Sequence, residues 1–92
     1  MITAIVMIKT EVDQIPEAAE AIAALDAVEE VYSVTGEWDL IAVVKVPVHE
    51  ELADLIPGRV NKVPGVLHTD THIAFRTHSS RDLDAAFAIG LD

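Results

Sequence analysis

The feature that most constrains this fold is a pair of segments, residues 2–9 and 40–46, that are aliphatic on both sides of an extended chain. In the first segment, one side carries Ile2, Ala4, Val6 and Ile8, and the other carries Thr3, Ile5 and Met7. A strand with one side in water normally alternates apolar and polar residues, whereas a strand covered on both sides does not. We therefore predict two inner strands that each need a covering layer on both faces.

Two further segments have the periodicity of helices. A stripe of apolar residues at helical spacing predicts a first helix over residues 13–27, with Asp13 as its N-cap and Pro16 in its first turn. Residues 49–63 are predicted to form a second helix, with a kink or a break at the adjacent Pro57 and Gly58.

The remaining segments complete a sheet. Residues 28–35 alternate β-branched and polar side chains and are predicted to pair with residues 40–46 as an antiparallel hairpin. Residues 66–76 form a fourth predicted strand. Residues 79–92 carry a weak capping box and a helical stripe, which indicate a short C-terminal helix.

The resulting order of elements is the ferredoxin-like βαββαβ pattern of an α+β domain. Two helices cover one face of a four-stranded antiparallel sheet and leave the other face bare. Because the inner strands are aliphatic on that face too, we expect a second copy to cover it, as a sheet-to-sheet dimer (a dimeric α/β barrel). The domain is expected to span residues 1–78, and residues 79–92 are expected to form a tail.

The composition excludes several classes of function. The chain has no cysteine, which removes disulfides, a thiolate nucleophile and cysteine-ligated metals. Its formal net charge of −10 is opposite to the field that binds nucleic acid, so no direct DNA or RNA contact is expected. The sequence has no signal peptide and no apolar stretch of membrane length, which predicts a cytoplasmic protein without a membrane partner. It has no phosphate loop and no nucleophile motif, so we expect neither a cofactor nor an enzyme.

Two sequence blocks carry a resemblance to a known family. Residues 31–40 read VYSVTGEWDL, and residues 63–72 read VPGVLHTDTH. At this spacing and in this order of elements, they resemble the effector-binding (RAM) domain of the Lrp/AsnC family of amino-acid-responsive regulators. That domain carries V-x-x-x-x-x-V-T-G-x-x-D and P-G-V-x-x-T-x-T blocks at these places. The resemblance covers about residues 1–77.

The resemblance implies dimers through the sheets, assembly of the dimers into an octamer or a decamer, and an amino acid or related small molecule bound where dimers meet. In the family, this domain follows an N-terminal helix-turn-helix that binds DNA. Here the first predicted strand begins at Met1, so the resemblance is to a stand-alone form that lacks the helix-turn-helix module. A full-length DNA-binding relative is then a further candidate partner.

The first block supplies four candidate ligand-binding residues, which are Gly36, Glu37, Trp38 and Asp39. Gly36 offers a bare backbone N–H to a ligand, or it only supplies the positive φ of a hairpin turn. Asp39 could accept bonds from a ligand ammonium, or from the amides of the turn. Glu37 could bind a ligand in the same way, or is only solvated. Trp38, expected to be exposed at the loop tip, is predicted to contact a neighbouring subunit or a ligand.

The second block places different side chains on the two faces of the last strand. Thr69 and Thr71 offer hydroxyl groups to a ligand carboxylate, or are only good strand formers. His68, Asp70 and His72 alternate on the opposite face and are a weak candidate for a metal site or an acid–base cluster. Because alternate positions on one strand rarely converge on one ion, we expect no metal here and favour a polar, pH-sensitive patch.

These observations favour a small-molecule-binding regulatory domain that self-assembles and acts by changing its assembly or by docking on a partner. One alternative is a small dimeric αβ-barrel enzyme of the cofactorless oxygenase or isomerase kind. The aliphatic stripe of the second helix argues against it, because such enzymes need an aromatic or histidine side chain in a roomy cleft. The other alternative is a structural subunit that joins a full-length DNA-binding relative.

Overall fold

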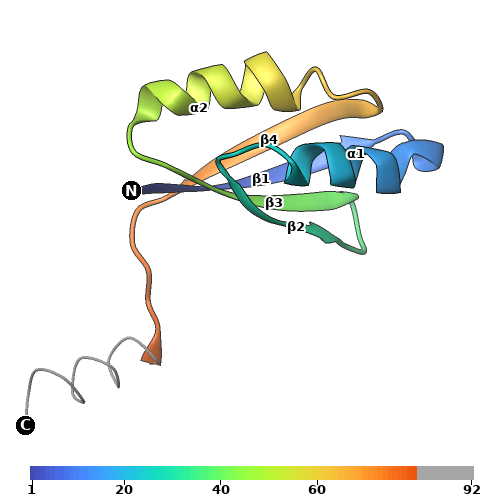
Figure 1. Cartoon of the computed structure of the whole chain (residues 1–92). Coiled ribbons are helices and arrows are strands. Elements are labelled where there is room, and N and C mark those ends of the chain that lie inside the picture. Colours follow the sequence, from blue (N-terminus) through green and yellow to red (C-terminus); the bar gives the residue numbers. More distant parts are fainter. Residues whose placement is uncertain (81–92) are drawn as a thin grey trace, which may run out of the picture.

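One antiparallel sheet with two helices on a single face forms the body of the protein (Figure 1). The computed structural model describes residues 1–80. The strands are β1 (Ile2–Thr10), β2 (Val28–Ser33), β3 (Leu40–Val46) and β4 (Val66–Ala74), and the helices are α1 (Ile15–Ala23) and α2 (His49–Leu55). A 3-10 turn, η1 (Val12–Gln14), precedes α1, and a π turn, η2 (Ile56–Val60), follows α2. The predicted βαββαβ order is confirmed, whereas the predicted tail helix falls mainly outside the described residues.

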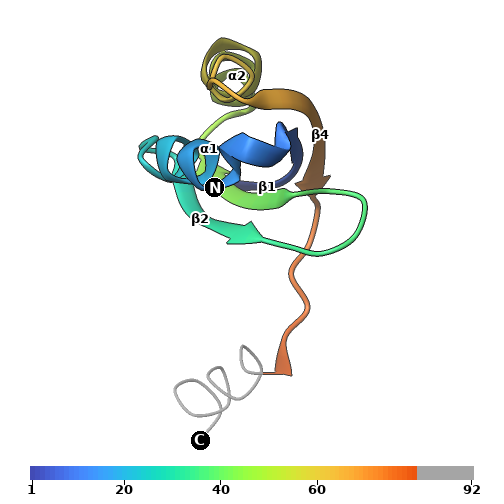
Figure 2. The same ribbon diagram turned by 90° about the vertical axis from the view of Figure 1, so that its right-hand side faces the viewer.

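The strand order β2-β3-β1-β4 puts the two segments that are aliphatic on both sides at the centre of the sheet. β1 pairs antiparallel with β3 along its length, from Ile2 opposite Val46 to Ile8 opposite Leu40. On its other side, β1 pairs antiparallel with β4. Figure 2 shows how the strongly twisted sheet curves around the helices. β2 and β4 are therefore the edge strands.

The core lies between the sheet and the two helices. The even-numbered residues of β1 and β3 point toward it, and most of them are almost completely buried. They meet apolar residues of α1, α2 and η2, which are Ala18, Ile22, Leu52, Leu55, Ile56 and Val60. Every second residue of the inner strands thus packs against the apolar stripes of the helices, and this happens on one face of the sheet only.

The opposite face, which we call the open sheet face, has no covering element among residues 1–80. Its centre is formed by the odd-numbered aliphatic residues of the inner strands, Ile5, Met7, Ile41 and Val43. Ile5 is 38% exposed, and the other three are partly buried by their neighbours. The sequence prediction of a bare aliphatic face is confirmed, and the same residues would be removed from water if a second layer covered them.

The first helix is shorter than predicted. It begins at Ile15, after the 3-10 turn η1, so its N-cap is Gln14 and the prediction of Asp13 as the N-cap is wrong. The N-cap makes no side-chain hydrogen bond, and a proline occupies the first turn, where a missing N–H costs nothing. The helix ends at Ala23, because the N–H of Leu25 bonds the carbonyl of Ile22 in a tighter turn.

Proline also explains the end of the second helix. Pro57 has no N–H to continue the α-helical ladder, and the backbone widens into η2, where the N–H of Asn61 bonds the carbonyl of Ile56 at 2.9 Å. At the predicted kink or break, the structure shows a change from α-helix to π turn without a break, and the helical segment ends at Val60 and not at residue 63. No helix in residues 1–80 is long and apolar enough to cross a membrane.

The two edge strands end two residues earlier than predicted. β2 stops at Ser33, because the N–H of Val34 already closes the turn by bonding the carbonyl of Asp39 at 3.1 Å. β4 stops at Ala74, which is paired with Thr3 near the beginning of β1, so residues beyond Ala74 have no partner strand within residues 1–80.

Candidate functional site

The turn that joins β2 and β3 is fixed against the end of β1. Gly36 has a φ of +104°, which is the conformation that the sequence predicted for a turn glycine, and a Cβ there would meet no atom within 4 Å. The N–H of Asp39 bonds the carbonyl of Ile8 at 3.0 Å. The turn is thus a rigid extension of the sheet and not a free loop.

The carboxylate of Asp39 anchors this turn a second time. Its Oδ2 accepts the backbone N–H of Thr10 at 2.9 Å and lies 3.7 Å from the ammonium of Lys9. At this place the pairing of β1 with β4 shifts register, between Lys9 and Thr10. The carboxylate thus bonds an amide of strand β1 and not an amide of its own turn, and the ligand contact predicted from the sequence stays a prediction.

Lys9 connects the turn with the start of β4. Its ammonium donates a hydrogen bond to the backbone carbonyl of Glu37 at 2.9 Å, and Lys9 lies opposite His68 in the β1–β4 ladder. Together, Lys9, Glu37, Trp38 and His68 line a hollow of about 240 Å³ at the rim of the open sheet face. We call it the rim hollow. Trp38 forms part of its wall and is partly buried, not fully exposed as the loop position suggested.

The rim hollow offers complementary chemistry within a small volume. The ammonium of Lys9 and an N–H of the His68 ring can donate to a carboxylate. The carboxylate of Glu37 can accept from an ammonium, and Trp38 provides an apolar wall. A volume of about 240 Å³ is below the roughly 300–1,000 Å³ of pockets for drug-sized ligands. The arrangement therefore suits a small zwitterionic or anionic molecule.

The two threonines of the second block lie on the other side of the sheet. Thr69 faces the helices, and its hydroxyl donates to the Oδ1 of Asn61 at 2.7 Å. It lines a second hollow of about 280 Å³, which we call the threonine hollow, with Asn61, Val66, Leu67 and His68. Thr71 lines neither hollow. Gly36 and Asp39 also line neither, so only Glu37, Trp38 and Thr69 of the predicted ligand-binding residues line a hollow. His68 lines both hollows.

The alternating row on β4 does not converge. His72 Nε2 lies 3.2 Å from Asp70 Oδ2, and both side chains are more than half exposed. His68 lies beside Lys9, farther along the strand. Within residues 1–80, no group of three or more histidine or acidic side chains is placed to hold a metal ion.

The sequence did not predict three residues of the two hollows. These are Lys9, Asn61 and His68, the last of which the sequence suggested only for a metal site or an acid–base cluster. Their nearness to the turn depends on the register of β1 against β4 and on the course of the chain after η2. A lysine that ends an aliphatic strand is the only signal that the sequence offers for Lys9.

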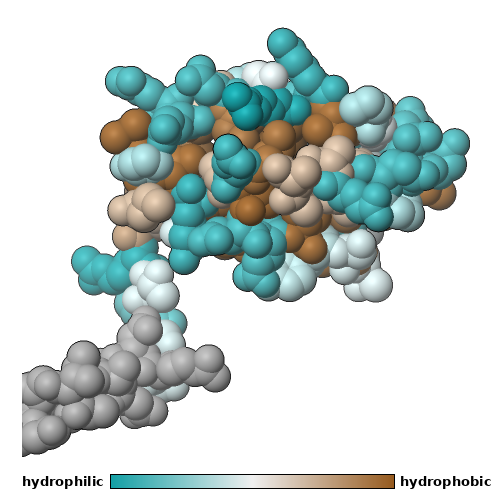
Figure 3. All heavy atoms as spheres, viewed as in Figure 1, coloured by the Kyte–Doolittle hydropathy of each residue, from teal (hydrophilic) through white to brown (hydrophobic). Residues whose placement is uncertain are grey.

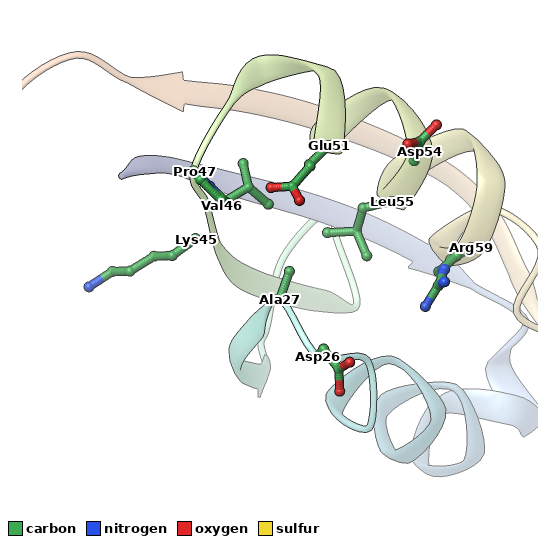
Figure 4. Close-up of a pocket in the computed structure, with 9 residues that line it drawn as sticks. All are labelled: Asp26, Ala27, Lys45, Val46, Pro47, Glu51, Asp54, Leu55 and Arg59. Atoms are coloured by element: carbon green, nitrogen blue, oxygen red, sulfur yellow. The ribbon is translucent and has the colours of Figure 1, made fainter.

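A larger hollow of about 380 Å³ lies on the helical side, between the α1–β2 turn and α2. In Figure 3, apolar residues reach the surface in the middle of this side of the molecule. The close-up in Figure 4 shows Leu55 and Val46 toward the hollow, whereas the ammonium of Lys45 and the carboxylate of Asp54 point away from it. Only the Glu51 carboxylate lies between these two apolar side chains, and the hollow contains none of the ligand-binding residues that the sequence predicted.

One ionisable group near the open sheet face is perturbed. The hydroxyl of Tyr32 donates to the Glu30 carboxylate at 2.6 Å, and this hydrogen bond raises the pKa of the tyrosine, with smaller contributions from desolvation and from the negative charge of Glu30. Tyr32 pairs with Ile41 on the face that is open in the single chain.

The fold and the rim hollow define a ferredoxin-like domain with a bare aliphatic sheet face and a small polar site at its edge. The model of the Lrp/AsnC ligand binding domain matches residues 3–83, and the chain belongs to this family.

Relatives and solved structures agree with this assignment. An uncharacterised HTH-type transcriptional regulator of Pyrococcus furiosus is 35% identical over 78 residues, which cover 82% of this chain and 52% of that protein. The chain spans about half the length of the curated relatives that it matches. A crystal structure of a protein from Thermus thermophilus superposes with a TM-score of 0.82 at 43% identity, covering 86% of this chain and 99% of that one. A Neisseria meningitidis transcriptional regulator, solved as an L-Met complex, shares the fold with a TM-score of 0.76 at 13% identity, covering 86% and 54% of the two chains.

Proposed function

We infer that this chain is a small-molecule-binding regulatory domain whose copies assemble through the open sheet face and which binds an amino acid in the rim hollow. The observation that carries this proposal is the position of the hollow, which combines an ammonium, a carboxylate and an indole ring at the edge of an unpartnered aliphatic face. A ligand bound beside a subunit contact stabilises the assembly that contains it, and this is how the domain would regulate.

An amino acid is the first ligand class to test, because its carboxylate and ammonium match Lys9 and Glu37, and its side chain can lie on Trp38. The solved L-Met complex of the Neisseria regulator supports this choice. The naming of the curated relatives as transcriptional regulators supports binding without catalysis. The same proposal places the protein in the cytoplasm, where a chain without cysteine needs no oxidising compartment.

Thermal unfolding in the presence of each of the twenty amino acids tests ligand binding. At about 100 times Kd, a ligand that binds only the folded state adds about 2.7 kcal/mol, which is a shift of about 10–20 °C for a domain of this size. In the Lys9→Met variant the shift should disappear. The matched control is Lys45→Met. The Lys45 side chain is 46% exposed, against 44% for Lys9, and it also has one acidic neighbour, but Lys45 does not line the rim hollow.

Two results would refute ligand binding as proposed. If no amino acid stabilises the wild-type chain, the ligand class is wrong. If Lys9→Met responds as strongly as Lys45→Met, the rim hollow is not the site.

Sedimentation of the Ile5→Glu variant tests assembly through the open sheet face. Covering a carboxylate without a partner costs several kcal/mol per subunit, so the dimer dissociation constant should rise by at least about 100-fold. Val48→Glu is the control, because Val48 is 51% exposed but lies at the start of α2, away from the open sheet face. The wild-type runs also show whether dimers assemble further into an octamer or a decamer. A wild-type monomer at micromolar concentration would refute the proposal.

A further inference from the structure

The segment that follows β4 leaves the body of the protein. After Ala74, residues 75–80 run away from both helices, toward the side of the open sheet face (Figures 1 and 2). Phe75, the first residue of this segment, is 100% exposed, and the residues after it are exposed as well. An aromatic ring normally buries 150–250 Å² of surface in a folded protein, so a fully exposed phenylalanine indicates a contact outside the described chain.

A second copy is within reach of this segment. The five residues 75–79, which lie in neither a helix nor a strand, span up to about 17 Å when extended, whereas two sheets packed face to face are about 10 Å apart. A segment that leaves one sheet on its open side can therefore cross the thickness of a sheet-to-sheet interface and lie on the facing protomer. Its own core is closed to it, because the buried positions of β1 and β3 are already filled by the helices.

The charge of the segment is complementary to the rest of the protein. Residues 75–80 contain Arg76 and His78 and no acidic residue, whereas residues 1–74 contain thirteen aspartates and glutamates against four lysines and arginines. On the exposed edge strand β2, Glu29 and Glu30 are both exposed, and Tyr32 beside them is 47% exposed. This strand offers an aromatic side chain for Phe75 and carboxylates for the cations.

We propose that residues 75–80 form an exchanged arm, which leaves its own protomer at the end of β4 and lies along β2 of a second copy, with Phe75 as its anchor. The arm extends the assembly that the proposed function requires, and the inference therefore rests on that function. Exchange of the arms adds a contact at the rim of the open sheet face and does not change the centre of the proposed sheet-to-sheet interface. It makes the strength of the dimer depend on a residue whose side chain is fully exposed in its own chain.

The Phe75→Ser variant of the full chain tests the anchor. Burial of one phenylalanine side chain corresponds to about a ten- to hundredfold change in affinity. A symmetric dimer loses two such side chains, so its dissociation constant should rise by about 100- to 10,000-fold. Val12→Ser is the control, because Val12 is 86% exposed and lies on η1, away from the arm. Its dissociation constant should equal that of the wild type. An unchanged constant for Phe75→Ser would overturn the proposal.

Mixed dimers test the exchange directly, because the readout is the position of the arm and not a change in the dimer dissociation constant. The chain has no cysteine, so His78→Cys gives a single site for a nitroxide label. When a labelled chain is mixed with an isotope-labelled wild-type chain, amide signals of β2 (Val28–Ser33) in the second chain should broaden. If the wild-type chain dimerises but shows no broadening there, the arm is not exchanged, and the proposed function is unaffected. If neither chain dimerises, self-assembly itself fails and the arm proposal fails with it.

Discussion

Replacement of Asp39 by alanine is the perturbation whose cost follows most directly from the structure. The side chain is 20% exposed, and its carboxylate accepts the N–H of Thr10, a residue that is only 2% exposed. A hydrogen bond to a charged acceptor contributes about 1.5–3 kcal/mol, and its loss leaves the N–H without a partner. The ion pair with Lys9 adds no more than about 0.5 kcal/mol, because the Lys9 side chain is 44% exposed and screened by water.

The expected loss for Asp39→Ala is therefore about 2–3 kcal/mol in the free energy of unfolding. Asp39→Asn keeps an oxygen acceptor but not the charge and should lose about 1 kcal/mol. The control is Glu37→Ala in the same turn, whose carboxylate makes no hydrogen bond or ion pair within residues 1–80, so that its effect should stay within about 0.5 kcal/mol.

Urea unfolding, followed by far-ultraviolet circular dichroism, measures these differences. All variants must be compared at one protein concentration, since self-association adds to the apparent stability. If Asp39→Ala loses no more stability than Glu37→Ala, the anchoring role of the carboxylate is refuted, and its side chain is again available as a ligand contact.

Three further outcomes follow from local geometry. The hydroxyl of Thr10 is buried without a hydrogen-bond partner within residues 1–80, so Thr10→Val should raise the free energy of unfolding by up to about 1 kcal/mol in urea; a loss of stability would show that the hydroxyl is satisfied. Gly65 and Gly36 both have positive φ, but only at Gly65 would a Cβ come within 2.6 Å of another side-chain atom. Gly65→Ala should therefore cost about 1–2 kcal/mol more than Gly36→Ala in the same assay, and equal costs would contradict the clash. Glu30→Gln removes the acceptor charge that raises the pKa of Tyr32, so the only tyrosine of the chain should ionise at lower pH in an absorbance titration. Since a raised pKa favours the protonated folded state, any stability that this hydrogen bond contributes should be lost as the pH rises through the pKa of the folded protein, and an unchanged titration would refute the interaction.

The sequence by itself determined the order of the elements and the identity of the inner strands. Side-chain alternation is a local property with a period of two residues, and residues 2–9 and 40–46 violate it on both faces, which is the pattern of strands that are covered twice. The predicted bounds of β3, Leu40–Val46, agree with the structure, because Asp39 and Pro47 limit the strand on both sides. The positive φ of Gly36 could be predicted for the same local reason.

Only the tertiary structure decided which polar side chains meet. Lys9 and His68 are 59 positions apart in the sequence, and nothing local fixes the register that puts them opposite each other at the rim of the sheet. The same register puts Thr69 on the helical side, next to Asn61. It thus separates Thr69 from the turn residues of the first block, although both were predicted to bind the ligand. Local periodicity determines which face of the sheet a side chain occupies. Long-range strand pairing determines which side chains from other strands lie beside it, and these together form the binding site.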